Sequence, residues 1–255
     1  MFNAAGAYDR FMGRYSVLLA PQMAELARVA PGQHVLDVGC GPGALAGELV
    51  HRLGPGGVTA IDPSEPFIAA VRSRYPGVDA RVASAESLPF ADATFDAACS
   101  QLVVHFMRDP VAGIREMARV TRAGGVIVAC VWDHAGRRGP LAPFWDAARE
   151  IVPDVDDEGH RPGVAEGDLA RIFAQAGLRD IEMRTLVAPL THPTFDAWWE
   201  PFELGVGPAG AFVASLDPER RAALRERVRA RVPARDFHQD AWAWAARGVI
   251  PGGAA

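Results

Sequence analysis

The sequence predicts an α/β fold built on a mostly parallel sheet, and three observations predict it. Short apolar segments typical of buried strands recur along the first half of the chain. Helical or crossover segments separate them, as parallel strands require. The first predicted strand, at residues 35–38, is followed by Gly39, Gly41 and Gly43 and then by a helix at 44–53. Strand, glycine turn and helix together place a nucleotide-like ligand against backbone N–H groups.

The other elements of the first half follow from apolar spacing. Tyr8, Phe11 and Tyr15 belong to one helical pattern, and residues 21–29 continue as a second helix that ends at a PGQ break. Ser64 is a candidate N-cap for the helix after the second strand. The next predicted elements are strands at 58–62, 78–83, 95–100 and 126–132, and an amphipathic helix at 111–120. The strand at 126–132 is the most apolar, so we place it centrally.

The second half of the chain carries two inserts around one helix-strand unit. The expected elements are a helix at 143–152, a helix at 167–177, a strand at 181–190, helices over 193–231 and a last strand at 241–251. The Gly/Pro-rich segment 134–165 and the helical segment 192–238 interrupt this order. Long connections within a compact domain are usually functional or mobile. We expect both inserts to project on the side where the strands end, within one domain spanning residues 1–255.

Composition excludes several kinds of chemistry. The chain has 255 residues, a formal charge of −5 and 26 cationic residues, all of them arginine. Without lysine there is no Schiff-base or P-loop lysine. The negative charge argues against nucleic acid as a partner. Cys40, Cys99 and Cys130 form no CxxC pair, so we expect buried free thiols and no metal site.

No apolar run approaches the length of about 20 residues that a membrane span needs. The N-terminus also lacks the pattern of a signal peptide. We therefore expect a cytoplasmic protein with no membrane insertion, as a monomer or homodimer.

Two kinds of ligand are compatible with the glycine turn. Gly39, Gly41 and Ala44 fit a dinucleotide fingerprint, which predicts an NAD-dependent oxidoreductase. Asp37, two residues before the first glycine, would repel a pyrophosphate but suits an ammonium group. Asp62 ends the second strand, where a carboxylate can accept hydrogen bonds from both ribose hydroxyls. A single nucleoside with an aminoacyl tail therefore explains more of the residues around the turn.

Five segments resemble class I S-adenosylmethionine-dependent methyltransferases, in the branch that includes the ubiquinone and menaquinone C-methyltransferases. The resemblance covers residues 35–132 closely and 166–190 loosely. The matching segments are VLDVGCGPG at 35–43, AIDPS at 60–64, ASAESLPFADATFD at 83–96, CSQLVVHFMRDP at 99–110 and RAGGVIVA at 122–129. It implies a Rossmann-like seven-stranded sheet of order 3-2-1-4-5-7-6 with strand seven antiparallel, and S-adenosylmethionine as cofactor.

The resemblance also implies roles for individual residues. The three glycines would wrap the methionyl part with Asp37 near its ammonium group, Asp62 would hold the ribose, and Pro63 would lie against the adenine. The family usually has Asp where this chain has Ser84, so backbone groups of neighbouring residues are the alternative adenine contact. The expected cofactor-binding residues are Tyr8, Arg14, Asp37, Gly39, Gly41, Gly43, Asp62, Pro63, Ser84, Ala85, Glu86 and Gln101.

The acceptor is expected to be a small molecule bound between the two inserts, which would form a lid. O-, N- and C-methylation stay open. His105 is the candidate general base, and a packing role for it is the alternative. The expected substrate-binding residues are His105, Trp132, His134, Trp145 and Trp198. A cofactor-binding protein without transferase activity is the alternative function, and the oxidoreductase is disfavoured by Asp37.

Overall fold

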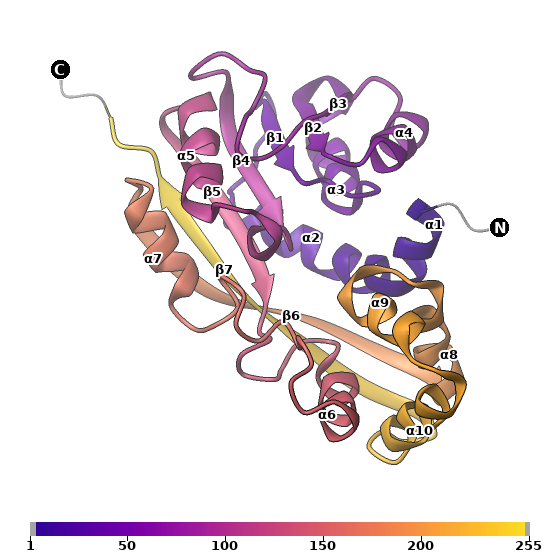
Figure 1. Cartoon of the computed structure of the whole chain (residues 1–255). Helices are drawn as coiled ribbons and strands as arrows, with labels where there is room; N and C mark the ends of the chain where they lie inside the picture. Colours follow the sequence, from indigo (N-terminus) through magenta and orange to yellow (C-terminus); the bar gives the residue numbers. More distant parts are fainter. Residues whose placement is uncertain (1–3, 253–255) are drawn as a thin grey trace.

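The protein, described here from a computed structural model over residues 4–252, is built on one seven-stranded sheet with helices on both faces (Figure 1). The strand order is β3-β2-β1-β4-β5-β7-β6. Strands β1 to β5 pair in parallel, and β7 runs antiparallel to both β5 and β6. The strands are β1 (Val35–Val38), β2 (Val58–Asp62), β3 (Asp79–Val82), β4 (Phe95–Gln101), β5 (Thr121–Trp132), β6 (Arg179–Thr194) and β7 (Arg235–Val249). The predicted order, with its one antiparallel strand, is confirmed.

The helices alternate with the strands as far as β5 and then form the inserts. They are α1 (Ala4–Tyr8), α2 (Arg14–Leu26), α3 (Ala44–Leu53), α4 (Glu65–Arg74), α5 (Pro110–Val120), α6 (Ala142–Ile151), α7 (Asp168–Gln175), α8 (Phe195–Trp199), α9 (Gly207–Ser215) and α10 (Pro218–Arg229). A π-helical turn, Asp9–Gly13, joins α1 to α2, and short 3₁₀ turns lie at Pro55–Gly57, Val104–Phe106 and Glu200–Leu204.

Two details of the predicted helices are wrong. Helix α2 runs through Pro21, so residues 14–26 form one helix where a new helix was expected at residue 21. The other detail is the cap of α4. Ser64 does occupy its N-cap position, but its side chain makes no capping hydrogen bond. Instead the Ser64 N–H donates to Asp62 Oδ1 at 2.8 Å, so the carboxylate of β2 organises the start of the helix.

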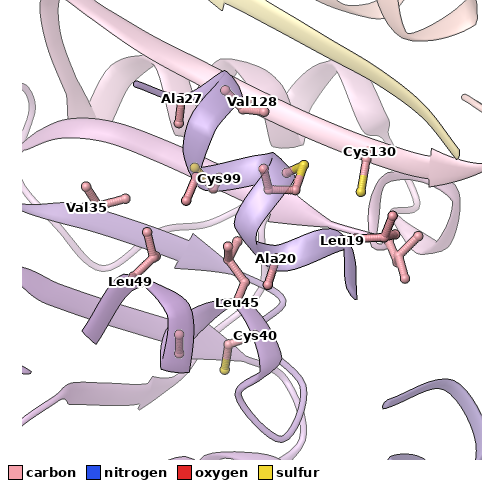
Figure 2. Close-up of a cluster of buried hydrophobic side chains, with 14 of the residues drawn as sticks. Leu19, Ala20, Ala27, Val35, Cys40, Leu45, Leu49, Cys99, Val128 and Cys130 are labelled. Carbon is pink, nitrogen blue, oxygen red and sulfur yellow. The ribbon is translucent and has the colours of Figure 1, made fainter. Parts of the chain in front are cut away.

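Successive side chains of each strand point to opposite faces of the sheet, and helices bury both faces. One face packs against α2, α3 and α4 in a cluster that includes Leu19, Val35 and Leu49 (Figure 2). The three cysteines also lie in this cluster and are free and buried, as predicted. The other face packs against α5 and α7. Parallel strands covered by helices on both faces explain the near-continuous apolar runs of the sequence.

Beyond the end of β5, strands β6 and β7 continue as a two-stranded ribbon (Figure 1). β5 pairs with β7 only over Ala243–Val249, whereas β6 pairs with β7 as far as Thr194 and Arg235. Both strands therefore extend into the segment 192–238 that was expected to be an insert, and the helical part between them is shorter. The ribbon carries α8, α9 and α10 at its tip.

A third apolar cluster joins the two inserts. It combines α6 of the first insert with α8, α9 and α10 of the second, and it also takes in Phe11 and Phe237. Phe144 stacks on Phe202 with ring centroids 4.6 Å apart, and Phe11 meets Phe202 edge-on at 5.0 Å. The inserts and the N-terminal helices thus share one core. Among the described residues, no helix is both long and apolar enough to cross a membrane.

Candidate cofactor and acceptor site

The glycine turn after β1 needs glycine at each of its three predicted positions, for different reasons. Gly39, Gly41 and Gly43 all have left-handed φ angles, of 72°, 52° and 100°. A Cβ on Gly39 would lie 2.4 Å from Val103 Cγ2, and a Cβ on Gly43 would lie 2.8 Å from Tyr75 Cε2. A Cβ on Gly41 would meet nothing within 4 Å. Gly41 therefore faces open space, which is where a ligand can approach the backbone.

Two buried carboxylates flank this turn and differ in how they are satisfied. Asp62 accepts hydrogen bonds from Gly41 N at 2.9 Å and Ser64 N at 2.8 Å. Both oxygens of Asp37 are buried without a hydrogen-bond partner. Burial, together with the nearby charge of Asp62, raises the pKa of Asp37 to about 8. Burial also raises the pKa of Asp62, against the effect of its two N–H donors.

An outer hollow of about 520 Å³ lies at the carboxyl ends of β2 and β4. Its lining residues include Gly39, Pro63, Ser84, Ala85, Glu86, Val103, Phe106, Met107 and Arg108. The Ser84 hydroxyl donates to the Glu86 carboxylate, whose other oxygen accepts from Arg108 N at 2.9 Å. Thus the four residues expected here, Pro63, Ser84, Ala85 and Glu86, are brought together, and the Glu86 carboxylate lies beside Ser84.

A much smaller inner hollow lies behind the turn, between α3 and the N-terminal helices. It is lined by Asp37, Gly39, Gly41, Tyr8 and Gln101 among others. Gln101 donates to the Ser16 carbonyl at 3.0 Å, and its own carbonyl oxygen is buried without a partner. The unpaired oxygens of Asp37 and Gln101 therefore lie at one hollow that ammonium or amide N–H groups could satisfy.

Arg14 lies elsewhere. Its guanidinium donates to the carbonyls of Ala197 at 3.2 Å and Trp198 at 3.3 Å, at the end of α8. The structure therefore brings Arg14 to the second insert, and it lines neither the outer nor the inner hollow.

An apolar pocket lies on the other side of Tyr8. Its lining includes Tyr8, Phe11, Leu102, His105, Phe106, Trp132, His134, Leu141, Glu158 and Val206. Three of the expected substrate residues, His105, Trp132 and His134, are among them. Polar groups in this pocket are few, which is typical of sites for small apolar molecules.

Burial controls the charges in the apolar pocket. It lowers the pKa of His105 well below its usual value, with further lowering by His134 and Arg161. It also lowers the pKa of His134 to about 4, which Arg161 reinforces. Both imidazoles are therefore neutral at pH 7. Burial raises the pKa of Glu158 to about 7.

The two other expected tryptophans are packed into the third cluster. Trp198 is fully buried, and its Nε1 donates to Gln239 Oε1 at 3.3 Å. Trp145 packs edge-on against Phe144 at 4.9 Å. Neither lines the apolar pocket, so the structure gives both of them the contacts of core residues.

The three hollows share lining residues and therefore meet. Gly39 lines the outer and inner hollows, Phe106 lines the outer hollow and the apolar pocket, and Tyr8 lines the inner hollow and the apolar pocket. The sequence did not single out Val103, Phe106 or Glu158. The first two lie in the segment at 99–110 whose overall pattern was noticed, whereas Glu158 lies in an irregular loop with no periodic signal.

Fold and site together define an α/β protein whose first glycine turn is open and flanked by two buried carboxylates, an arrangement typical of nucleotide-binding folds. Residues 36–129 match a family model that is described as "Methyltransferase domain". A probable S-adenosylmethionine-dependent methyltransferase of Mycolicibacterium smegmatis is 30% identical over 187 residues, covering 69% of this chain and 70% of that protein. The chain belongs to the class I S-adenosylmethionine-dependent methyltransferase family.

Two further similarities differ in the share of each chain that they cover and in sequence identity. Malonyl-[acyl-carrier protein] O-methyltransferase of Erwinia pyrifoliae is 33% identical over 135 residues, covering 48% of this chain and 51% of that protein. The chain thus spans about half the length of some of the curated relatives it matches. A phosphoethanolamine N-methyltransferase of Haemonchus contortus, solved with S-adenosylhomocysteine, has a TM-score of 0.58 at 17% identity, covering 99% of this chain and 61% of that one. That likeness concerns the fold alone.

Proposed function

We propose that this protein transfers a methyl group from S-adenosylmethionine to a small, largely apolar acceptor held in the apolar pocket. This proposal rests on the contact between the three hollows, each pair of which shares one lining residue: Gly39, Tyr8 or Phe106. A cofactor whose adenosine fills the outer hollow and whose aminoacyl end fills the inner hollow would present its sulphonium at their junction. That junction borders the apolar pocket.

The residues present fit this cofactor. The unpaired carboxyl group of Asp37 suits the ammonium group, whose positive charge favours the ionised form of the carboxyl. Asp62 uses one lone pair of each oxygen on a backbone N–H and keeps acceptor capacity for the two ribose hydroxyls. Pro63 and Ala85 line the space for the adenine, and Glu86 is the acceptor we assign to its amino group in place of the usual Asp.

The protein's main catalytic task is orientation. S-adenosylmethionine supplies a methyl carbon already activated for in-line displacement, with S-adenosylhomocysteine as the leaving group. Holding the acceptor atom in line with the bond between sulphur and the methyl carbon removes a large part of the activation free energy of the transfer. The apolar walls exclude water from the pocket. For a hydroxyl acceptor, His105 is neutral and has a buried Nδ1 without a partner, so it is the base we assign to the departing proton.

The inserts supply the acceptor side. Leu141 of the first insert and Val206 of the second line the apolar pocket together with the N-terminal Phe11. We assign them the role of a lid over the acceptor, with the third cluster, including Trp198, as the core that holds the lid in place.

Calorimetric titration of the whole chain with S-adenosylmethionine and with NAD tests the cofactor. Binding of S-adenosylmethionine alone is expected, and binding of NAD alone would refute the proposal. Asp62→Ala is expected to weaken cofactor binding by about 1–3 kcal/mol, because buried donors and the ribose lose their acceptor. An unchanged affinity would remove Asp62 from the ribose site.

A screen of phenols, quinols, amines and fatty acids for S-adenosylhomocysteine production tests the transfer step. We expect turnover with at least one apolar acceptor. Cofactor binding without turnover across the whole screen would favour the alternative of a binding protein without transferase activity.

A further inference from the structure

Three buried side chains with metal-binding atoms converge at the apolar pocket from three separate segments. His105 lies in the turn after β4, His134 follows β5 directly, and Glu158 belongs to the first insert. One ligating atom from each lies within 4.8 Å of the other two. Their residues are 5%, 9% and 2% exposed. Two imidazoles and a carboxylate seldom gather out of water unless something binds them together.

The present partners leave His105 unsatisfied and hold Glu158 through Trp145 and a long ion pair. His105 Nδ1 is buried with no hydrogen-bond partner, whereas buried polar groups are nearly always paired. Glu158 has an ion pair with Arg161 whose Nη1–Oε1 distance is 3.8 Å, longer than a hydrogen bond. Arg161 lies closer to Asp156, at 3.4 Å, and over the ring of Phe106. Arg161 therefore keeps other partners if Glu158 turns to a ligand.

The backbone holds the Glu158 carboxylate in place against a conformational cost. Glu158 has a φ of 66°, which is uncommon for a residue with a long side chain. The side chains of the two preceding aspartates stabilise this turn: Asp156 Oδ1 accepts from Glu158 N at 3.1 Å, and Asp157 Oδ1 accepts from Gly159 N at 3.0 Å. Glu158 is thus buried directly after two aspartates that are more exposed.

We propose that His105, His134 and Glu158 bind one divalent transition-metal ion of the zinc or ferrous type at the wall of the apolar pocket. Two His and one carboxylate are the ligands such ions take in sites that keep open coordination positions. At bond lengths of about 2.1 Å, ligand atoms on one ion lie about 3.3 Å apart. The three atoms must therefore close by at most about 1.5 Å, a distance within the reach of side-chain rotation.

The open positions of such an ion would face the pocket, since all three ligands line it. The acceptors it favours are those with an oxygen donor, such as phenols or enols, whose hydroxyl it would acidify. The acidification of an acceptor hydroxyl rests on the proposed function, whereas the binding of the ion is independent of it. When the ion is bound, His105 is a metal ligand and no longer a free base.

Metal titration of the tag-free whole chain tests the proposal. The protein is stripped with chelator, confirmed folded by circular dichroism, and titrated with Co²⁺ as a spectroscopic probe and with Zn²⁺ in competition. We expect one ion per chain, with the visible absorption of low-coordinate Co²⁺. His105→Gln, His134→Gln and Glu158→Gln should each weaken binding at least about 100-fold.

His160→Gln and His238→Gln are the matched controls, because both histidines are exposed and lie beside an aspartate. They should bind the ion as the unaltered chain does. Folded protein that takes up no stoichiometric Co²⁺ or Zn²⁺, or binding lost equally in the controls, would overturn the metal site. S-adenosylmethionine titration of the same samples is a separate readout, so failure of the metal site leaves the proposed function standing.

Discussion

Residues 35–132, which the proposed function makes the donor side, and the two inserts, which it makes the acceptor side, are built by different means. On the donor side the turn is made by glycine backbone, and Asp62 is held by two backbone N–H groups. On the acceptor side large side chains from distant segments pack together in the third cluster. The family model matches only residues 36–129. Backbone-made binding thus leaves a recognisable sequence pattern, whereas side-chain packing leaves little.

The sharpest test of this separation is Trp198→Ala. Trp198 is fully buried and packs on Phe202 at 4.7 Å between ring centroids. Truncation should lower the free energy of unfolding by about 3–5 kcal/mol, because it leaves a large cavity in the third cluster. Urea denaturation measures the loss. In the folded fraction, S-adenosylmethionine affinity should stay within about threefold, a difference of well under 1 kcal/mol.

Trp198→Phe is the milder control and should lose less stability. If folded Trp198→Phe protein no longer bound the cofactor, the donor and acceptor sides would be energetically inseparable.

Within the donor side, Gly39→Ala and Gly41→Ala separate folding from binding. The Gly39 change places a Cβ 2.4 Å from Val103, so we expect a loss of about 2–4 kcal/mol in unfolding free energy. The Gly41 change meets no protein atom within 4 Å, so it should cost only about 1 kcal/mol in stability, for its positive φ. Its larger effect should be on cofactor affinity, measured by calorimetry. Equal cofactor affinity in Gly41→Ala and the unaltered chain would contradict a ligand at this turn.

Asp37→Asn tests the buried charge through its pH dependence. The pKa of Asp37 is 3.8 in an unperturbed chain and about 8 in the folded protein. Between these values the folded state holds a proton that the unfolded state has released, so stability falls as pH rises from 4 to 8. An asparagine at this position does not titrate, so the substitution removes the loss of stability that accompanies the rise in pH. The variant should be more stable than the unaltered chain by about 2–4 kcal/mol at pH 8, with the gap closing towards pH 4.

Chemical denaturation at pH 5 and pH 8 gives the comparison, and calorimetry should show weaker S-adenosylmethionine binding by the variant. A gap independent of pH would show that Asp37 does not titrate in this range.

The smallest expected effect is that of Tyr15→Phe, at the contact between α2 and the ribbon. The Tyr15 hydroxyl lies 3.1 Å from His192 Nε2 and donates to Gln239 Oε1 at 3.0 Å. Its removal should cost about 1–2 kcal/mol in thermal or urea unfolding, mostly from the partners left unpaired. No change at all would mean that the ribbon is held by ring packing alone.

Sequence patterns predicted the sheet and the glycine turn well because their signals are local. Helix 44–53 and strand 58–62 lie at the predicted residues, since apolar spacing and glycine position determine both. The partners of Arg14 could not be predicted, because they lie 183 and 184 residues away along the chain. The three residues that we propose as metal ligands gave no sequence signal for the same reason. His105, His134 and Glu158 have no ligand spacing, and only the fold brings them together.

The second insert also leaves the ribbon and returns to it at a single point. The Phe195 N–H donates to the Ala234 carbonyl at 3.1 Å, where β6 ends and β7 begins. A segment whose two ends touch can be exchanged for one of another length without moving the strands that carry it. In the proposed function this segment contributes Val206 to the apolar pocket, so a change in its length would alter one wall of the acceptor site while the strands stay in place.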